Sequence, residues 1–329
     1  MKSTVALIFG GEGYEHEISL VSAENIRRFL DKSKYEVIPV FISKSGEWFI
    51  EKDGERLPTF PVYISGISGL YSSGKILPVD LAVPALHGDF GEDGVVAGAL
   101  SCAHIKFLGC GVLAGAVSSD KITAKMIADA IGIPTARWTF FTGETADEAR
   151  KRCESLLSYP LFIKPSSLGS SIGISKAARG EDFPLAYGSA CAFDKRILVE
   201  EAIDVKYELE CAYLGLKDRD CFAIGRVLSD GKFYGFREKY GGGVKTEAAE
   251  LGSETRDAVI SMARALKEAM GISGISRFDF FLTEDGKILF NEINTFPGMT
   301  PTSLYPVLTE KMGFQKGEFI NKLSEEALL

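Results

Sequence analysis

The chain has 329 residues, a length typical of two or three compact domains. Hydrophobic residues make up 46% of it and charged residues 25%, a globular balance that excludes a largely disordered chain. The 37 basic and 45 acidic residues give a net charge of −8, which argues against a general nucleic-acid-binding protein but permits a local basic pocket for an anionic ligand.

The first third of the chain alternates apolar runs with helix-period segments. Residues 4–9, 35–43 and 80–86 are predicted strands, while a helical stretch follows the first strand and another spans residues 94–103. This rhythm predicts an α/β, doubly wound N-terminal domain with a mostly parallel sheet. Loops are then expected at the carboxyl ends of its strands.

A new unit is expected to begin near residues 109–115. The predicted helices beyond this point span residues 120–131, 146–157 and 253–270. The predicted strands span residues 137–141, 160–164, 196–201, 208–214, 221–228, 274–282 and 287–291.

Three further features limit location and chemistry. No apolar run reaches the ~20 residues needed to cross a bilayer, so we do not expect membrane insertion. The N-terminal apolar run is too short for a secretion signal, and we therefore expect a cytoplasmic protein. The six cysteines form no C-x-x-C pair, which favours buried, reduced thiols over disulfides or zinc ligands.

Two motifs match well-known signatures but lack a necessary part. Residues 69–75 have the spacing of a P-loop, but Ile76 stands where a Ser or Thr must bind Mg²⁺. Residues 169–173 match the G-x-S-x-G nucleophile elbow around Ser171, yet all three histidines precede that serine, whereas a hydrolase of this kind needs its histidine after it. We therefore predict neither a P-loop enzyme nor a serine hydrolase.

The segment from residue 164 to 173 is better explained as a phosphate cradle. Its glycines let backbone amides approach phosphate oxygens, its serines add donors, and Lys164 adds a positive charge. A glycine–serine hairpin with no ligand remains the alternative. Glu200 and Glu201 end another predicted strand, where carboxylates can accept hydrogen bonds from adenine or ribose.

Acidic side chains near the C-terminus form a second candidate site. Arg277 and Asp279 share one face of a predicted strand, and Glu292 and Asn294 share one face at the end of the next. Pairing these strands would bring three oxygen ligands together, as Mg²⁺ requires when it also holds nucleotide phosphates. The neighbouring arginine suits a developing oxyanion.

Five segments in order carry a family resemblance. Beside the glycine–serine loop after Lys164, they are GGEGYEHEISL at residues 10–20, HGDFGEDG at 87–94, DKITAK at 120–125 and FNEINTFPGMT at 290–300. Over nearly its whole length the sequence resembles the D-alanine–D-alanine ligases of the ATP-grasp superfamily.

This resemblance implies an ATP-grasp fold, with a pre-ATP-grasp substrate domain at residues 1–112. A central subdomain (113–201) and a C-terminal one (202–329) would sandwich the nucleotide. The implied activity joins two D-alanine molecules through D-alanyl phosphate for peptidoglycan precursor synthesis. It would use ATP with two Mg²⁺ ions, or Mn²⁺ in their place, in a homodimer.

The resemblance also assigns roles to residues that match the family motifs. In the first substrate site, Glu15 would orient the ammonium group of D-alanine with His87 nearby. The residues expected to bind the nucleotide are Lys121, Lys164, Ser171, Glu200, Glu201, Ile203, Glu208 and Lys239. The residues expected to act in catalysis are Glu15, Ser170, Tyr240, Arg277 and Gly298. Asp279, Glu292 and Asn294 would hold the metal ions, and Ser303 and Leu304 would receive the second substrate.

Departures from the family pattern keep two alternatives open. Gly13 occupies a position that is usually serine, and the expected mobile loop after Tyr240 carries Gly241–Gly243 and lacks an expected proline. Because that loop helps to select the second substrate in the family, a D-alanine–D-serine or D-alanine–D-lactate ligase is one alternative. A nucleotide-binding relative without catalysis is the other, although all the proposed metal ligands and Arg277 are present.

Overall fold

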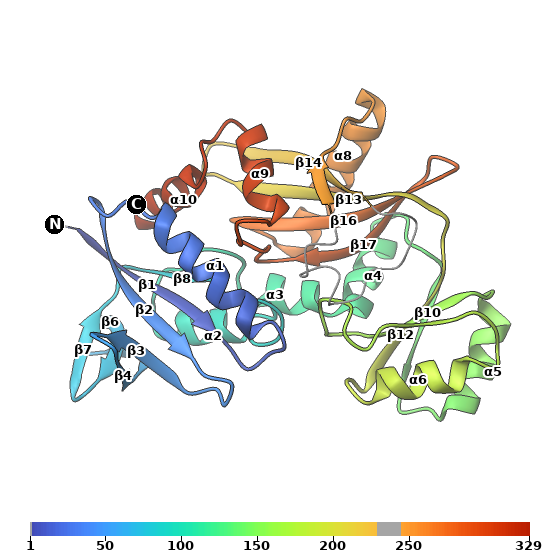
Figure 1. The fold of residues 1–329 in the computed structure, drawn as a ribbon, viewed down its shortest axis with the longest axis horizontal. Helices are drawn as coiled ribbons and strands as arrows, with labels where there is room; N and C mark the ends of the chain where they lie inside the picture. The colour runs from blue at the N-terminus through green and yellow to red at the C-terminus, as the bar shows by residue number, and fades with distance from the viewer. Residues whose placement is uncertain (1, 229–244) are drawn as a thin grey trace.

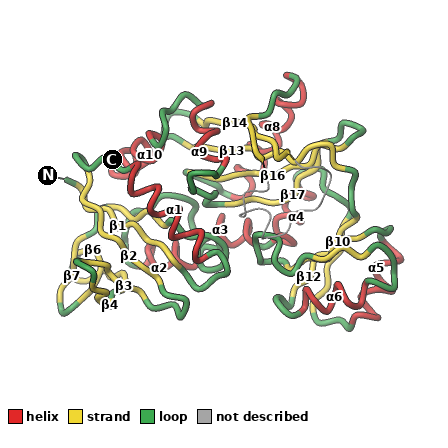
Figure 2. The backbone as a smooth tube through the Cα atoms, viewed as in Figure 1, coloured by secondary structure: helices red, strands yellow, loops and turns green. Residues whose placement is uncertain are grey.

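The computed structural model describes residues 2–228 and 245–329. Strands gather in separate sheets, with helices packed over them (Figure 2). The N-terminal sheet and the largest C-terminal sheet lie together with helices between them, and a smaller sheet with its own helices stands to one side (Figure 1). The chain ends in α10, and the start of β1 lies on the same side of the molecule (Figure 1).

The N-terminal sheet has the strand order β4-β3-β2-β1-β8, in which β1, β2 and β8 are parallel. Val5 and Leu7 of β1 face the core beneath α1, whereas Ala6 and Ile8 face the core beneath α2. Because alternate side chains of one strand serve both faces, the doubly wound prediction is confirmed. The elements are β1 (Ser3–Gly10), α1 (His16–Phe29), β2 (Tyr35–Ile42), β3 (Trp48–Lys52), β4 (Glu55–Pro58), β8 (Leu81–Pro84) and α2 (Val95–Cys102).

Residues 48–78 contain strands that the sequence analysis did not predict. Besides β3 and β4, they form a three-stranded sheet of β5 (Phe60–Ile64), β6 (Ile67–Ser72) and β7 (Lys75–Pro78). Three of these hairpins turn on two residues that both have positive φ, Asp53-Gly54, Ser65-Gly66 and Ser73-Gly74. The P-loop spacing at residues 69–75 therefore lies on an antiparallel hairpin, which confirms that it is no phosphate loop.

The central sheet has the order β11-β10-β12-β9, and α5 and α6 pack against one of its faces. Ile163 and Val199 belong to that packed core, so their neighbours Lys164 and Glu200 face the opposite side. The antiparallel β10–β11 pair frames the glycine–serine loop. The elements are β9 (Trp138–Thr142), α5 (Ala146–Leu156), β10 (Leu161–Pro165), β11 (Ser175–Ala177), α6 (Phe183–Cys191) and β12 (Arg196–Glu201).

The C-terminal sheet has the order β15-β14-β13-β16-β17. Leu209, Phe278 and Phe280 pack with α3, α4 and α8 on one face, which leaves the alternate residues for the other face. The strands are β13 (Val205–Gly215), β14 (Asp220–Leu228), β15 (Lys245–Ala248), β16 (Ile275–Thr283) and β17 (Ile288–Asn294). The helices are α3 (Val112–Ser119), α4 (Lys121–Ala130), α8 (Ser253–Met270), α9 (Leu304–Lys311) and α10 (Glu318–Leu328).

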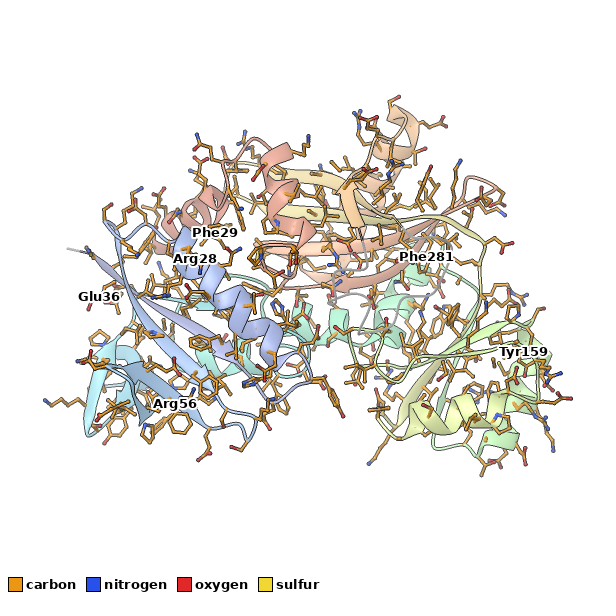
Figure 3. The ribbon with its side chains drawn as sticks, in the orientation of Figure 1. Arg28, Phe29, Glu36, Arg56, Tyr159 and Phe281 are labelled. Carbon is orange, nitrogen blue, oxygen red and sulfur yellow. The ribbon has the colours of Figure 1, made fainter. Side chains whose placement is uncertain are left out.

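The C-terminal helix α10 packs on the N-terminal domain as well as on α9, its neighbour in sequence. Phe319 of α10 contacts Phe29 at the end of α1, with ring centroids 6.5 Å apart, in the region where Figure 3 labels Phe29. Residues of both ends of the chain share one hydrophobic core. This shared core fixes the N-terminal sheet against the C-terminal one.

No helix in residues 2–228 or 245–329 is long and apolar enough to cross a membrane. All six cysteines are free thiols, as expected. Cys153 and Cys211 are buried, but Cys102 and Cys191 are exposed, so the prediction that the thiols are buried is wrong for these two.

Candidate active site

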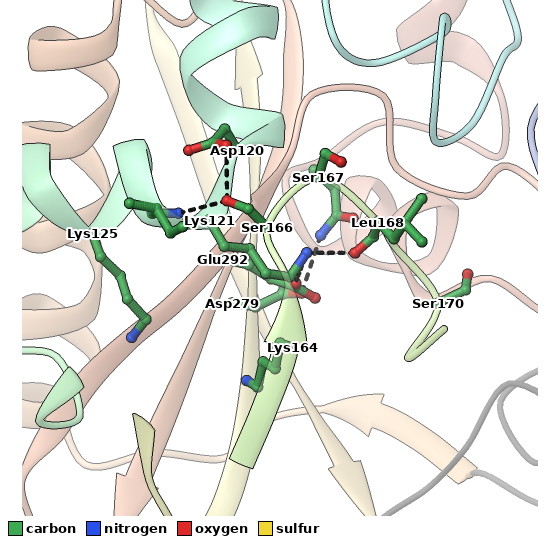
Figure 4. Close-up of polar contacts among 12 residues, drawn as sticks. Asp120, Lys121, Lys125, Lys164, Ser166, Ser167, Leu168, Ser170, Asp279 and Glu292 are labelled. Carbon is green, nitrogen blue, oxygen red and sulfur yellow. Dashed lines mark hydrogen bonds and ion pairs between the residues drawn. The ribbon is translucent and has the colours of Figure 1, made fainter. Parts of the chain in front are cut away.

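The start of α4 is tied to the loop that follows β10 (Figure 4). Asp120 caps the helix by accepting from the Thr123 amide at 2.7 Å, and it also accepts from the Ser166 hydroxyl at 2.8 Å. The Lys121 ammonium donates to the Leu168 carbonyl at 2.6 Å. It also lies 3.3 Å from the Glu292 carboxylate. Lys121 therefore joins the loop to the face of the C-terminal sheet that carries Asp279 and Glu292, called the acidic face below.

Lys164 lies beside a second buried lysine. Its ammonium contacts Glu200, and Lys125 of α4 lies 3.0 Å from the other oxygen of the same carboxylate. Burial would raise the pKa of Glu200, but the two ammonium groups outweigh burial and lower that pKa to about 2. Glu200 is therefore ionised. The sequence analysis gave Lys125 no role.

The glycine–serine loop reaches across to the N-terminal sheet. Ser170 and Ser171 both adopt left-handed backbone angles, with φ of 52° and 60°. The Ser170 hydroxyl donates to a Glu15 oxygen at 2.5 Å. Gly88 has a φ of 67°, which favours glycine, and a Cβ there would lie 2.5 Å from the other Glu15 oxygen and displace that carboxylate. The structure thus brings together Glu15 and Ser170, both of which were predicted to act in catalysis.

His87 anchors the loop that follows β17. Its Nδ1 lies 3.1 Å from the Phe296 carbonyl, which only accepts, so Nδ1 carries the proton and Nε2 accepts from the Ser22 hydroxyl at 2.8 Å. The Met299 amide donates to the same hydroxyl at 3.3 Å. Burial lowers the pKa of His87, which keeps the ring neutral in this arrangement.

A cavity of about 220 Å³ opens next to His87, at the carboxyl ends of the parallel strands. Its lining includes Gly10, the last residue of β1, the following Gly11, and Phe90 and Val96. The loops that follow the parallel strands meet at this edge of the sheet.

Glu92 links the loop that contains His87 to the loop that follows β17. The sequence analysis gave Glu92 no role. Its carboxylate accepts from the Gly88 amide at 2.9 Å and from the Phe296 amide at 3.1 Å. Burial, with the charge of Glu15, raises the pKa of Glu92 to about 8. The motif that contains Glu92 was visible in the sequence, but its two partners, more than 200 residues apart, were not.

The two strands that carry the acidic side chains, β16 and β17, pair with each other in the C-terminal sheet. Asp279 lies opposite Glu292, and Arg277 lies opposite Asn294. Arg277 donates to both oxygens of Asp279, at 2.7 and 2.6 Å, and the Asn294 amide donates to Asp279 at 3.1 Å. Glu210 of β13 faces Asp279 from the other side and adds a carboxylate that the sequence analysis missed. Glu208 shares this face two residues earlier.

Ser303 precedes the first residue of α9. Its hydroxyl accepts from the Thr300 amide at 3.0 Å, and a Cβ at Gly298 would lie 2.9 Å from it. Gly298, predicted for the oxyanion site, and Ser303, predicted for the second substrate, therefore lie together. Leu304 instead directs its side chain into the hydrophobic core.

The remaining nucleotide-site predictions concern Glu201, Ile203 and Lys239. The Glu201 carboxylate accepts from Arg137 at 3.1 Å and from the Ser158 amide at 2.8 Å, on the side away from Glu200, so its side chain does not join Glu200. Ile203 follows β12 and is half-buried. Lys239 and Tyr240, with the predicted lid glycines, lie outside the described residues.

Two family models cover most of the chain. The model described as D-ala D-ala ligase N-terminus matches residues 4–110, and the one described as D-ala D-ala ligase C-terminus matches residues 127–325. The chain belongs to the D-alanine–D-alanine ligase family. A D-alanine–D-alanine ligase from Ruminiclostridium cellulolyticum is 37% identical, over 99% of this chain and 95% of its own.

Solved structures of this ligase family share the fold. The VanG D-Ala:D-Ser ligase from Enterococcus faecalis has a TM-score of 0.89 and 32% identity, covering 99% of this chain and all of its own. D-alanyl-alanine synthetase A from Vibrio cholerae has a TM-score of 0.87 and 34% identity, covering 100% of this chain and 99% of its own. The predicted α/β ATP-grasp fold is confirmed.

The acidic face in this family member fits a magnesium site by its donor chemistry. Among the described residues no group of three or more His, Cys, Asp or Glu side chains is arranged as a metal centre. Asp279, Glu292 and Asn294 nevertheless supply the hard oxygen donors that Mg²⁺ prefers. Burial raises the pKa of Asp279 to about 7, and the charges of Glu210 and Glu292 add to the rise although Arg277 opposes it. This crowding of negative charge is what a divalent cation would relieve.

Proposed function

We propose that this protein is an ATP-dependent ligase that joins two D-alanine molecules to D-alanyl-D-alanine, for peptidoglycan precursor synthesis in the cytoplasm. One relationship carries the proposal: Lys121 connects the glycine–serine loop, through the Leu168 carbonyl, to Glu292 on the acidic face. Lys121 thus lies between a loop proposed to bind phosphate and a face proposed to bind metal ions. Phosphoryl transfer needs both kinds of site next to each other.

In the first step a carboxylate oxygen of D-alanine attacks the γ-phosphorus of ATP, and ADP leaves. The product is D-alanyl phosphate. Lys121 and Lys164 offset the repulsion between the two anions, and Glu15, held by Ser170, orients the ammonium group of D-alanine. Two Mg²⁺ ions, held by Asp279, Glu292 and Asn294, would supply charge neutralisation at the phosphates.

In the second step the amine of a second D-alanine attacks the acyl carbon. Phosphate leaves as the amide bond forms, and the surplus amine proton passes to the departing phosphate. Arg277 and the Gly298 amide stabilise the oxyanion, and Ser303 holds the carboxylate of the second substrate. The acyl phosphate hydrolyses in water, so the glycine–serine loop must exclude solvent before the attack.

The choice of second substrate is the finer part of this proposal. The Enterococcus faecalis relative is named a D-Ala:D-Ser ligase, so D-serine is the alternative second substrate. A depsipeptide-forming ligase would use D-lactate. We propose D-alanine because the curated relatives with 34–37% identity are named D-alanine–D-alanine ligases.

An ADP-release assay tests the activity. ATP, Mg²⁺ and D-alanine alone are expected to give ADP and a dipeptide of matching mass. Faster ADP release with added D-serine or D-lactate, and the corresponding mixed product, would favour a sibling ligase. No ADP release with any of the three would contradict ligase function and favour a nucleotide-binding relative.

We further propose three domains, at residues 1–112, 113–201 and 202–329, and a homodimer. The face of the β5–β6–β7 sheet that lies away from buried Leu70 supports dimerisation. It exposes Phe60, Ile64 and Ile67 by 53, 47 and 45%. Light scattering of Ile64→Lys beside the unaltered protein tests this face, since loss of the dimer is expected only if the face is buried between two copies.

A further inference from the structure

Lys125 is the buried lysine for which the proposed reaction has no use. It lies one helical turn after Lys121 on α4, and only 1% of its side chain is exposed. Lysines are almost never fully buried unless they are paired. The partner of Lys125 is Glu200, whose side chain is 4% exposed and which also contacts Lys164. In Figure 4, Lys125 extends from α4 and Lys164 from the neighbouring strand.

This arrangement fixes the hydrogen-bonding character of Glu200. A carboxylate flanked by two ammonium groups stays ionised and can only accept hydrogen bonds. Each of its oxygens can accept two, so the lysines leave room for a ligand donor. An unpaired carboxyl in the same buried position would favour its neutral form, which can donate as well as accept.

Glu200 lies on the ligand side of the central sheet. Its partner in β10 is Phe162, and both face away from the core that Ile163 and Val199 form with α5 and α6. An aromatic ring beside an acceptor suits a purine base. A 6-aminopurine presents a donor to that acceptor, whereas a 6-oxopurine presents an acceptor and is repelled.

We propose that Lys125 is a positioning residue for nucleotide selection, which holds the Glu200 carboxylate so that the site accepts 6-aminopurine and rejects 6-oxopurine nucleotides. The inference rests on the proposed function, because that function places ATP against this sheet. Lys125 acts through Glu200 and touches no reacting atom.

Nucleotide binding without turnover tests the role. Calorimetry on the full chain would give Kd for ADP and IDP, which differ at position 6 and in protonation of the adjacent ring nitrogen. Lys125→Met is expected to lower the preference for ADP over IDP by ~10-fold or more, because the acceptor is no longer fixed. Lys125→Arg is expected to retain most of the preference. Lys267→Met is the matched control, because it removes a lysine of α8 from a 2.9 Å ion pair with Asp220 of β14.

A double variant separates this role from a phosphate contact. Glu200→Gln is expected to lose the preference by itself, and Lys125→Met added to it is expected to change the preference by less than about twofold. If Lys125 touched phosphate, ADP and IDP would weaken equally in Lys125→Met, and that result would overturn the proposal. An unchanged preference in a folded Lys125→Met protein would also overturn it.

Folding and activity are checked separately. Thermal unfolding and circular dichroism show whether Lys125→Met folds. If Lys125→Met does not fold, Lys125→Gln replaces it. The same loss of preference for ADP over IDP is then expected, and an unchanged preference would overturn the proposal. Ligation of D-alanine by the unaltered protein tests the proposed function independently. A protein that ligates nothing, yet prefers ADP and loses this preference in the variant, would refute the reaction and support the role of Lys125.

Discussion

The Ser170 hydroxyl donates a 2.5 Å hydrogen bond to Glu15, a residue 155 positions earlier in the chain. The bond connects the glycine–serine loop of the central sheet with the residue just before α1 on the N-terminal sheet. The loop assigned to ATP and the group assigned to the D-alanine ammonium are therefore coupled. A change on either side is expected to affect both substrates.

Ser170→Ala tests this coupling. Removing a hydrogen bond to a charged group costs about 1.5–3 kcal/mol, so kcat/KM for the first D-alanine is expected to fall roughly 10–100-fold. Ser167→Ala is the control, because its hydroxyl, in the same loop, bonds Asp194 at 2.8 Å instead. Steady-state kinetics measure this loss. A lower kcat/KM in Ser170→Ala alone, with an unchanged Tm, would support the coupling, and an equal loss of kcat/KM in both variants would contradict it.

Glu292→Gln tests the proposed metal site. The change keeps the volume but removes a negative charge that faces both Asp279 and the Lys121 ammonium. Mg²⁺-dependent ADP release is expected to fall ~100-fold or more while the fold persists. The exposed Glu284 on the same hairpin provides the control as Glu284→Gln. Near-normal ADP release across a Mg²⁺ titration would mean that Glu292 holds no metal.

Ser303→Ala tests the second-substrate site. The Ser303 hydroxyl lies against Gly298 and Thr300, so its removal is expected to raise KM for the second D-alanine ~10–100-fold and to affect the first much less. Thr302→Ala alters an exposed hydroxyl in the same turn and is expected to leave both constants close to normal. Equal effects of Ser303→Ala on both substrate constants would place Ser303 elsewhere.

Hydrophobic periodicity was sufficient to predict helices and strands whose pattern lies within a single stretch of sequence. The strand at residues 196–201 and the helix at 253–270 have the predicted bounds. The two-residue alternation also predicted that Asp279, Glu292 and Asn294 share one face once their strands pair, and β16 and β17, which are neighbours in sequence, do pair. The hairpins at residues 48–78 were missed although their Asp-Gly and Ser-Gly turns were visible, because their strands are only four to six residues long.

Long-range partners explain most of what the sequence analysis missed. Glu210 enters the acidic face only because β13 pairs with β16, a register set by tertiary packing. Glu92 meets the Phe296 amide, and Lys125 meets Glu200, across separate elements. The motifs marked Glu92 and Lys125 as part of the family pattern, but their burial and their partners depend on how the sheets come together.

The buried Glu200 predicts a specific loss of stability in acid. Its pKa is lowered to about 2 in the folded protein from an ordinary value of 4.5, because Lys125 and Lys164 outweigh the effect of burial. As pH falls below about 4.5 the unfolded chain takes up a proton that the folded protein does not, so stability decreases towards pH 2 and is fully present above pH 4.5. The contribution is on the order of 3 kcal/mol.

Urea unfolding of Glu200→Gln and of the unaltered protein between pH 7 and pH 3.5 measures this contribution to stability. The difference in free energy of unfolding is expected to stay constant near neutral pH and to shrink below about pH 4.5. Glu284→Gln, on an exposed turn, is expected to change that free energy by less than about 0.5 kcal/mol at each pH. A difference for Glu200→Gln that persists undiminished to pH 3.5 would show that the two lysines do not keep Glu200 ionised.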